Sequence, residues 1–191
     1  MADWPVPIDG VVESIVTTLG PNDRWNVAAL GLHGSGTDDV TAQTWGDTRT
    51  RRNFTARGGG YVQFSHDPVD FVDAALAVRE ETDPILDSAD AWVEVETQRV
   101  DSGTDGGTQW VEWRLAPVES AVERQTVPVT NRGYYAVVEA TVAASRLDVD
   151  AYDTETLRER LAYCERVVER CGGARDGEAF DRLRELVAWE D

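Results

Sequence analysis

Over the first two-thirds of the chain, short apolar stretches alternate with polar turn residues, a pattern typical of strands rather than long helices. The turn residues Gly20-Pro21-Asn22-Asp23 separate the first two stretches, which predicts a hairpin. A second turn, residues 103–107, separates two longer stretches that we expect to close an antiparallel barrel. The predicted strands are residues 11–18, 25–32, 40–45, 61–65, 91–100, 110–115 and 118–127.

Two short helices are expected between these strands. Asp47 is placed to cap a helix that ends at about Arg57, because Gly58-Gly59-Gly60 follows. Asp67-Pro68 opens a second helix that runs to about Val78, with proline near the first helical position. Both helices fall in the first two-thirds of the chain, which otherwise predicts strands.

The pattern changes after Pro128, where apolar residues recur three and four positions apart. This spacing predicts helices over residues 133–146, 154–171 and 178–189. The chain therefore predicts an α+β fold. We expect a mainly β domain over residues 1–127 and a helical extension over residues 128–191.

The chain is strongly acidic, with 36 Asp and Glu against 18 basic residues and a net charge of -18. Every basic residue is Arg, and the acidic residues are spread along the whole chain. High salt would screen the resulting repulsion, so we expect a protein of a salt-loving archaeon rather than an ordinary acidic protein. Pairs such as Glu80-Glu81 are interpreted as solvated surface.

This composition excludes several partners and chemistries. Nucleic acids and anionic membranes require a basic face, which the overall charge does not provide. No apolar run approaches ~20 residues, and the first residues lack the features of a secretory signal, so we expect a cytoplasmic protein. Two cysteines and two histidines are too few for a dedicated zinc site, and without Lys no Schiff base can form.

One segment departs from the general acidity. No Asp or Glu occurs between Asp47 and Asp67, and four arginines lie in that window. Three of them fall near the predicted start of a helix, where the helix dipole disfavours cations by ~0.3–1 kcal/mol each. A bound anion would reverse this cost, because free backbone amides and guanidinium groups together form a phosphate site. The alternative is a face that pairs with surrounding carboxylates.

The same segment resembles a known family. The run Thr50-Arg-Arg-Asn53, followed by the strand Gly60-Tyr-Val-Gln-Phe64, is similar to a pattern of flavin-reductase-like FMN-binding split barrels. The run Asn26-Val-Ala-Ala-Leu-Gly31 resembles the family's second strand, which lies beside the flavin ring. The order of these motifs is closest to an archaeal split-barrel group of unassigned activity that also has a helical extension.

The resemblance implies an FMN site in a split β-barrel. Thr50, Arg51 and Asn53 would contact the phosphate or the ribityl chain, with Arg49 and Arg52 nearby. The backbone of the second strand would face the isoalloxazine edge, and the third strand would line the same cleft. The residues implied in these two strands are Asn26, Ala28, Ala29, Leu30, Gly31, Thr44 and Trp45.

The resemblance also implies a homodimer with the flavin near the subunit interface. Relatives with reductase activity often carry Lys before the Thr motif and a Pro-Phe-Ser run in the second strand, and this chain has neither. These absences bear on reductase activity more than on flavin binding, and a flavin-dependent oxidoreductase is one expectation. A flavin or deazaflavin carrier or sensor, and a module that binds another phosphorylated ligand, are the alternatives.

A second candidate site is Asn131-Arg132, at the predicted start of the first C-terminal helix. Arg132 has the same mismatch with the helix dipole as the main arginine cluster. It would contribute to the cofactor site from the same subunit or from its partner. The alternative is a plain turn in which Asn131 caps the helix.

Overall fold

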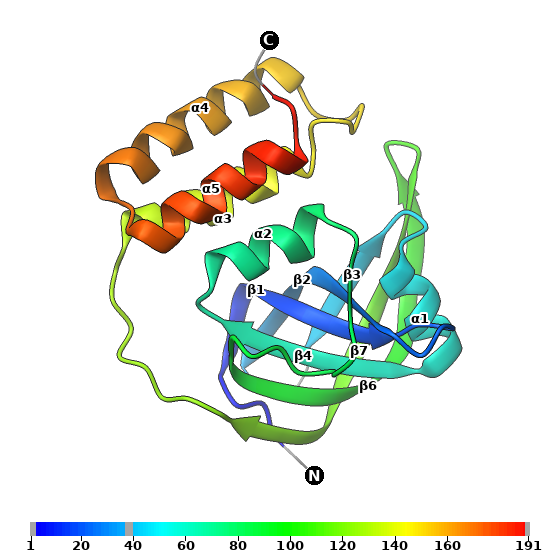
Figure 1. Cartoon of the computed structure of the whole chain (residues 1–191). Coiled ribbons are helices and arrows are strands. Elements are labelled where there is room, and N and C mark those ends of the chain that lie inside the picture. Colours follow the sequence, from blue (N-terminus) through cyan, green and yellow to red (C-terminus); the bar gives the residue numbers. More distant parts are fainter. Residues whose placement is uncertain (1–2, 37–39, 190–191) are drawn as a thin grey trace. The chain divides into compact units, whose positions relative to one another are not determined.

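A computed structural model describes residues 3–36 and 40–189. The chain divides into two compact units (Figure 1). The first consists of Met1–His66 and Arg79–Thr126, and the second of Asp67–Val78 and Val127–Asp191. The segment Asp67–Val78 thus belongs to the helical unit, although its sequence lies between two strands of the first unit. The predicted domain boundary at residue 127 stays a prediction.

The first unit is an antiparallel barrel. Its strand order is β1-β4-β6-β7-β3-β2-β5, and additional pairing of β1 with β2 closes the ring. This arrangement, with the helices of the second unit, confirms the predicted α+β split-barrel class. The strands are β1 (Ile8–Leu19), β2 (Trp25–Gly36), β3 (Thr41–Trp45), β4 (Gly59–Ser65), β5 (Arg79–Glu81), β6 (Ala89–Asp105) and β7 (Thr108–Val122).

The barrel is split along one edge of β2. Strand β1 pairs with the whole length of β2 and occupies its other edge. On the split edge, β5 pairs with Trp25, Asn26 and Val27, whereas β3 pairs with Leu32 and His33. Among the described residues, the stretch 28–31 has no strand partner on this edge. The backbone groups of this stretch that point to the split edge therefore have no ladder partner there, whereas those on the other edge pair with β1.

Alternating strand residues fill the barrel, because successive side chains point to opposite faces. Val62, Val93 and Val95 are fully or nearly fully buried in this core. Helix α1 (Arg49–Arg57) contributes Phe54, whose ring packs edge-on against Trp113 at a centroid distance of 5.4 Å. This burial fixes α1 against the barrel, while Arg49 and Arg52 of the same helix stay exposed.

Three sequence expectations about this unit need correction. Thr48, not Asp47, caps α1, because the Thr48 backbone is extended and its hydroxyl accepts from the Arg51 amide at 3.2 Å. The last hairpin turns at Gly106-Gly107, whose positive φ angles suit glycine, so residues 103–105 are still strand. The two stretches expected after this turn form one strand, β7, which ends at Val122.

The second unit packs helices around its own apolar core. Buried side chains that meet there include Val72, Val137, Leu161 and Leu183. Helix α5 begins four residues earlier than predicted. The helices are α2 (Pro68–Leu76), α3 (Arg132–Ala144), α4 (Thr154–Cys171) and α5 (Ala174–Leu186). No helix of the described chain is long and apolar enough to cross a membrane.

Candidate functional site

A pocket of about 300 Å³ lies at the start of α1. The turn between β1 and β2 forms one side, and the first two turns of α1 form another. Strands β2 and β5 complete it. Its lining residues are Gly20, Pro21, Asn22, Asn26, Arg49, Arg52, Asn53 and Glu80.

The electrostatics of this pocket favour an anion. The first turn of α1 contains no acidic residue, and Arg49 and Arg52 project from its first two turns into the pocket lining. Thr48 accepts the amide of Arg51, and the amides of Arg49 and Thr50 precede any intrahelical acceptor. Two guanidinium groups and the positive end of a helix dipole therefore meet at one place.

Buried side-chain amides connect α1 to the barrel behind the pocket. Asn26 Nδ2 lies 3.5 Å from Thr50 Oγ1, and both residues are buried. Asn53 Nδ2 donates to Thr18 Oγ1 at 3.0 Å and to Thr18 O at 3.3 Å. The structure thus brings together three polar residues that the sequence motifs singled out, Asn26, Thr50 and Asn53. Their predicted contacts with FMN stay predictions.

The arginines of the cluster have different partners. Arg49 Nη1 pairs with Glu80 Oε1 at 2.8 Å, and Arg52 Nη1 pairs with Asp47 Oδ2 at 2.9 Å. Arg51 turns away from the pocket lining and donates to Gly46 O at 3.1 Å. The expectation of a carboxylate-paired face therefore describes Arg49 and Arg52 in part. Both remain substantially exposed and line a pocket, so they are also available to a ligand.

Comparison with known proteins places the chain. A family model described as the N-terminal domain of a protein of unknown function (DUF447) matches residues 12–124. The model of the second DUF447 domain matches residues 131–185. The chain belongs to the DUF447 family.

Solved structures include a similar DUF447 protein. An FMN-bound protein of Methanosarcina mazei from this family has 25% identity, covers 93% of this chain and 95% of its own, and gives a TM-score of 0.81. An FMN-binding protein of Thermus thermophilus has 14% identity, covers 64% of this chain and 79% of its own, and gives a TM-score of 0.44. Nitrilotriacetate monooxygenase component B of Bacillus cereus has 15% identity, covers 62% of this chain and 71% of its own, and gives a TM-score of 0.44.

The residues that the split-barrel resemblance implied beside the flavin ring lie along β2 and β3 of this DUF447 chain. Leu30 is buried, and its carbonyl accepts from Ser14 Oγ at 2.7 Å. Thr44 is buried and its hydroxyl accepts from Trp113 Nε1 at 2.9 Å, whereas Trp45 at the end of β3 is 46% exposed. Neither Thr44 nor Trp45 lines the pocket at α1. The remaining three, Ala28, Ala29 and Gly31, lie on the open stretch of β2 and are half-buried.

Asn131 acts as a helix cap in the second unit of this DUF447 chain. Its Oδ1 accepts from Gly133 N at 2.8 Å, and its Nδ2 donates to the buried Asp176 at 3.1 Å. Both bonds are internal to the helical unit. Arg132 is exposed at the first position of α3. A contribution of Asn131 and Arg132 to a cofactor site stays a prediction.

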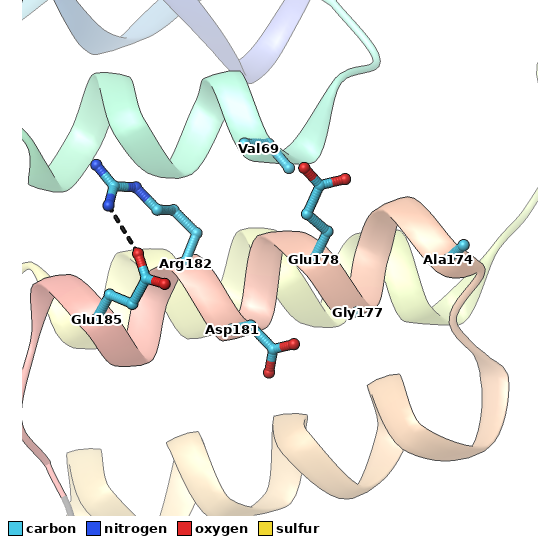
Figure 2. A pocket seen from close by; sticks show the side chains of 7 residues that line it. All are labelled: Val69, Ala174, Gly177, Glu178, Asp181, Arg182 and Glu185. Carbon is cyan, nitrogen blue, oxygen red and sulfur yellow. Dashed lines mark hydrogen bonds and ion pairs between the residues drawn. The ribbon is translucent and has the colours of Figure 1, made fainter.

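The helical unit of the DUF447 chain has a pocket of its own, between α2 and α5 (Figure 2). Each charged side chain of its lining has a partner, and several of these partners lie outside the lining: Arg182 bonds Asp73 at 2.7 Å and Glu185 at 2.8 Å. Glu178 pairs with Arg175 at 2.7 Å, and Asp181 pairs with Arg184 at 2.8 Å. Carboxylates outnumber guanidinium groups in this lining, so the pocket does not favour an anion such as phosphate.

Sequence reasoning missed part of the α1 pocket. Glu80 was interpreted as solvated surface, and the turn Gly20-Pro21-Asn22 only as a connection. Glu80 reaches the pocket because β5 pairs with β2, with Asn26 opposite Glu80 in the register. A three-residue strand has no periodicity of its own, so no local signal identifies this long-range pairing.

Proposed function

We propose that this chain binds FMN, with the phosphate in the pocket at the start of α1 and the ring along the open edge of β2. The observation that carries the proposal is the pocket itself. It gathers Arg49, Arg52 and the first amides of α1 in an otherwise acidic chain. An FMN-bound member of the same family with a TM-score of 0.81 supports the choice of ligand.

The residues present fit the phosphate end of FMN. A volume of about 300 Å³ is at the low end for ligand pockets, which suits a phosphate and part of a ribityl chain rather than a whole flavin. Guanidinium forks and amides supply charge-assisted hydrogen bonds, while Asn22 and Asn53 add amide groups suited to hydroxyls. On the split edge of β2, the backbone groups of residues 28–31 that do not pair with β1 would supply donors and acceptors for the polar edge of the ring.

Bound FMN would supply hydride or electron transfer, and the chain would anchor and orient it. In this assignment Arg49 and Arg52 contact the phosphate, and Thr50 is held behind them by Asn26. Arg51 does not line the pocket, and in this assignment it contributes only its positive charge to the electrostatic potential around the phosphate. We extend the proposal to an oxidoreductase that works as a homodimer in the cytoplasm of a salt-adapted archaeon, on the basis of the acidic composition and the family resemblance.

Binding is tested by titrating the protein with FMN and following the quenching of flavin fluorescence. Arg49→Ala and Arg52→Ala should each weaken binding by ~1.5–3 kcal/mol, or roughly 10- to 100-fold in Kd, through loss of a charge-assisted bond. Arg57→Ala is the matched control, because Arg57 lies in the last turn of the same helix and outside the pocket. Equal affinities in all three variants and the wild type would disprove this phosphate site.

Turnover is tested separately from binding. The FMN-loaded protein is mixed with a reduced nicotinamide cofactor without oxygen, and bleaching of the flavin absorbance is followed. Bleaching faster than that of free FMN supports a flavin-dependent oxidoreductase. No acceleration with either nicotinamide cofactor favours a flavin carrier or sensor instead.

A further inference from the structure

Glu80 places a carboxylate in the proposed phosphate pocket. Its Oε1 accepts from Arg49 Nη1 at 2.8 Å, and its Oε2 accepts from Asn22 Nδ2 at 3.1 Å. These are donors of the kind that an incoming phosphate would use. In the structure, the Glu80 carboxylate already accepts from both Arg49 and Asn22.

The backbone of Glu80 holds this carboxylate in place. Strand β5 pairs with β2 so that Glu80 lies opposite Asn26, which also lines the pocket. The Glu80 carbonyl accepts from Arg24 Nη2 at 3.2 Å, which ties the strand to the β1–β2 turn. The fold thus fixes the backbone of Glu80 in the pocket wall and keeps its carboxylate within reach of the pocket.

The contact is nevertheless easy to break. The side chains of Arg49 and Glu80 are 45% and 31% exposed, and ion pairs this exposed contribute little to stability. A phosphate monoester carries up to two charges and three acceptor oxygens, so it competes well for Arg49. After displacement, the Glu80 carboxylate would stay close to the phosphate and repel it.

We propose that Glu80 is an internal competitor for the FMN phosphate and keeps FMN binding exchangeable. This inference rests on the proposed function. FMN binding breaks the Arg49–Glu80 ion pair and brings the phosphate close to the negative Glu80 carboxylate. Glu80 therefore lowers the affinity for FMN. Riboflavin has no phosphate, so Glu80 does not lower the affinity for riboflavin. A pocket built in this way suits a protein that takes up and releases flavin rather than one that retains it.

The test compares FMN and riboflavin binding in Glu80→Gln with the wild type. Glutamine keeps the size of the side chain and its acceptor oxygen but removes the charge. We expect FMN to bind roughly three- to tenfold more tightly and to dissociate correspondingly more slowly, with riboflavin affinity unchanged. Glu80→Ala should shift FMN affinity in the same direction.

Glu81→Gln is the matched control. Glu81 is the next residue of β5, its carboxylate accepts from Arg79 Nε at 2.8 Å, and it does not line the pocket. We expect no change in affinity for either flavin. Equal tightening by Glu81→Gln would overturn the inference, because it would assign the effect to net charge alone.

The two proposals fail in different ways. If the wild type binds FMN and Glu80→Gln binds it equally or more weakly, Glu80 is no competitor, and weaker binding would make it a residue that positions Arg49. If wild type, Glu80→Gln and Glu81→Gln all fail to bind FMN, the proposed function and this inference are both overturned.

Discussion

At the residue scale, Asn53 shows how one side chain joins the pocket to the barrel. It lines the pocket, yet its amide nitrogen donates to both the carbonyl and the hydroxyl of Thr18 on β1. Both residues are buried, so these acceptors have no access to bulk water. The first consequence of this geometry is structural, because the bonds hold the middle of α1 against the barrel.

Asn53→Ala should therefore lower the free energy of unfolding by ~1–3 kcal/mol, since it leaves buried acceptors without a donor. Chemical denaturation in the absence of FMN measures this change, and Thr55→Ala is the control. Thr55 is on the exposed side of the same helix, and its hydroxyl bonds only the carbonyl of Arg51 one turn earlier. Unchanged stability in Asn53→Ala would show that these bonds do not hold the helix in place.

At the element scale, α3 and the turn between α4 and α5 approach each other at two glycines. A Cβ atom on Gly133 would lie 2.3 Å from the Cα of Gly172 and 2.7 Å from its nitrogen. Backbone atoms cannot rotate away as a side chain can, so the two elements would have to separate. The Asn131 bonds to Gly133 and Asp176 lie at the same crossing and would be strained with it.

Gly133→Ala should destabilise the helical unit by ~1–3 kcal/mol through overpacking. Gly177→Ala is a matched control, because Gly177 also lies in a helix but has nothing within 4 Å of an added Cβ. There alanine should stabilise the chain by ~0.5–1 kcal/mol through its better helix propensity. Thermal unfolding of both variants measures the difference, and similar shifts in both would contradict the close contact.

Elements with a strong local signal were predictable, and those fixed by long-range pairing were not. The turn at Gly20-Pro21-Asn22-Asp23 and the alternation on either side of it indicated the β1–β2 hairpin, which forms over 12 residue pairs. Strand β5 was missed because three residues cannot show a period. The start of α5 was placed too late, since Gly172-Gly173 and Gly177 lower helix propensity around a helix that begins at Ala174.

The same division holds for the site. Arg49 and Arg52 stood out because they interrupt an acidic sequence and conflict with the helix dipole. Glu80 has no such signal, because an acidic residue in this chain is the expected case. Only the pairing of β5 with β2 gives Glu80 a role, and that pairing depends on the whole barrel closing correctly.

At the scale of the whole molecule, the acidic residues outnumber the arginines that could pair with them. Even if each of the 18 arginines paired with one of the 36 carboxylates, 36 − 18 = 18 carboxylates would remain uncompensated. Pairs such as Arg182–Asp73 and Arg175–Asp67 bring distant segments together within the helical unit. Salt weakens these attractions and the repulsion alike, and the excess of negative charge decides the net sign.

The free energy of unfolding should therefore rise as KCl increases from about 0.1 M to about 1 M, while the Debye length falls from ~10 Å to ~3 Å. Most of the gain should come at the lower concentrations, because each added increment of salt shortens the Debye length most there. Denaturation by urea at fixed KCl concentrations measures it, and sucrose, which is excluded from protein surfaces but carries no charge, is the control. A gain that sucrose reproduces fully would assign the effect to solute exclusion. A loss of stability with KCl would show that the ion pairs, rather than the excess carboxylates, dominate the electrostatics of this chain.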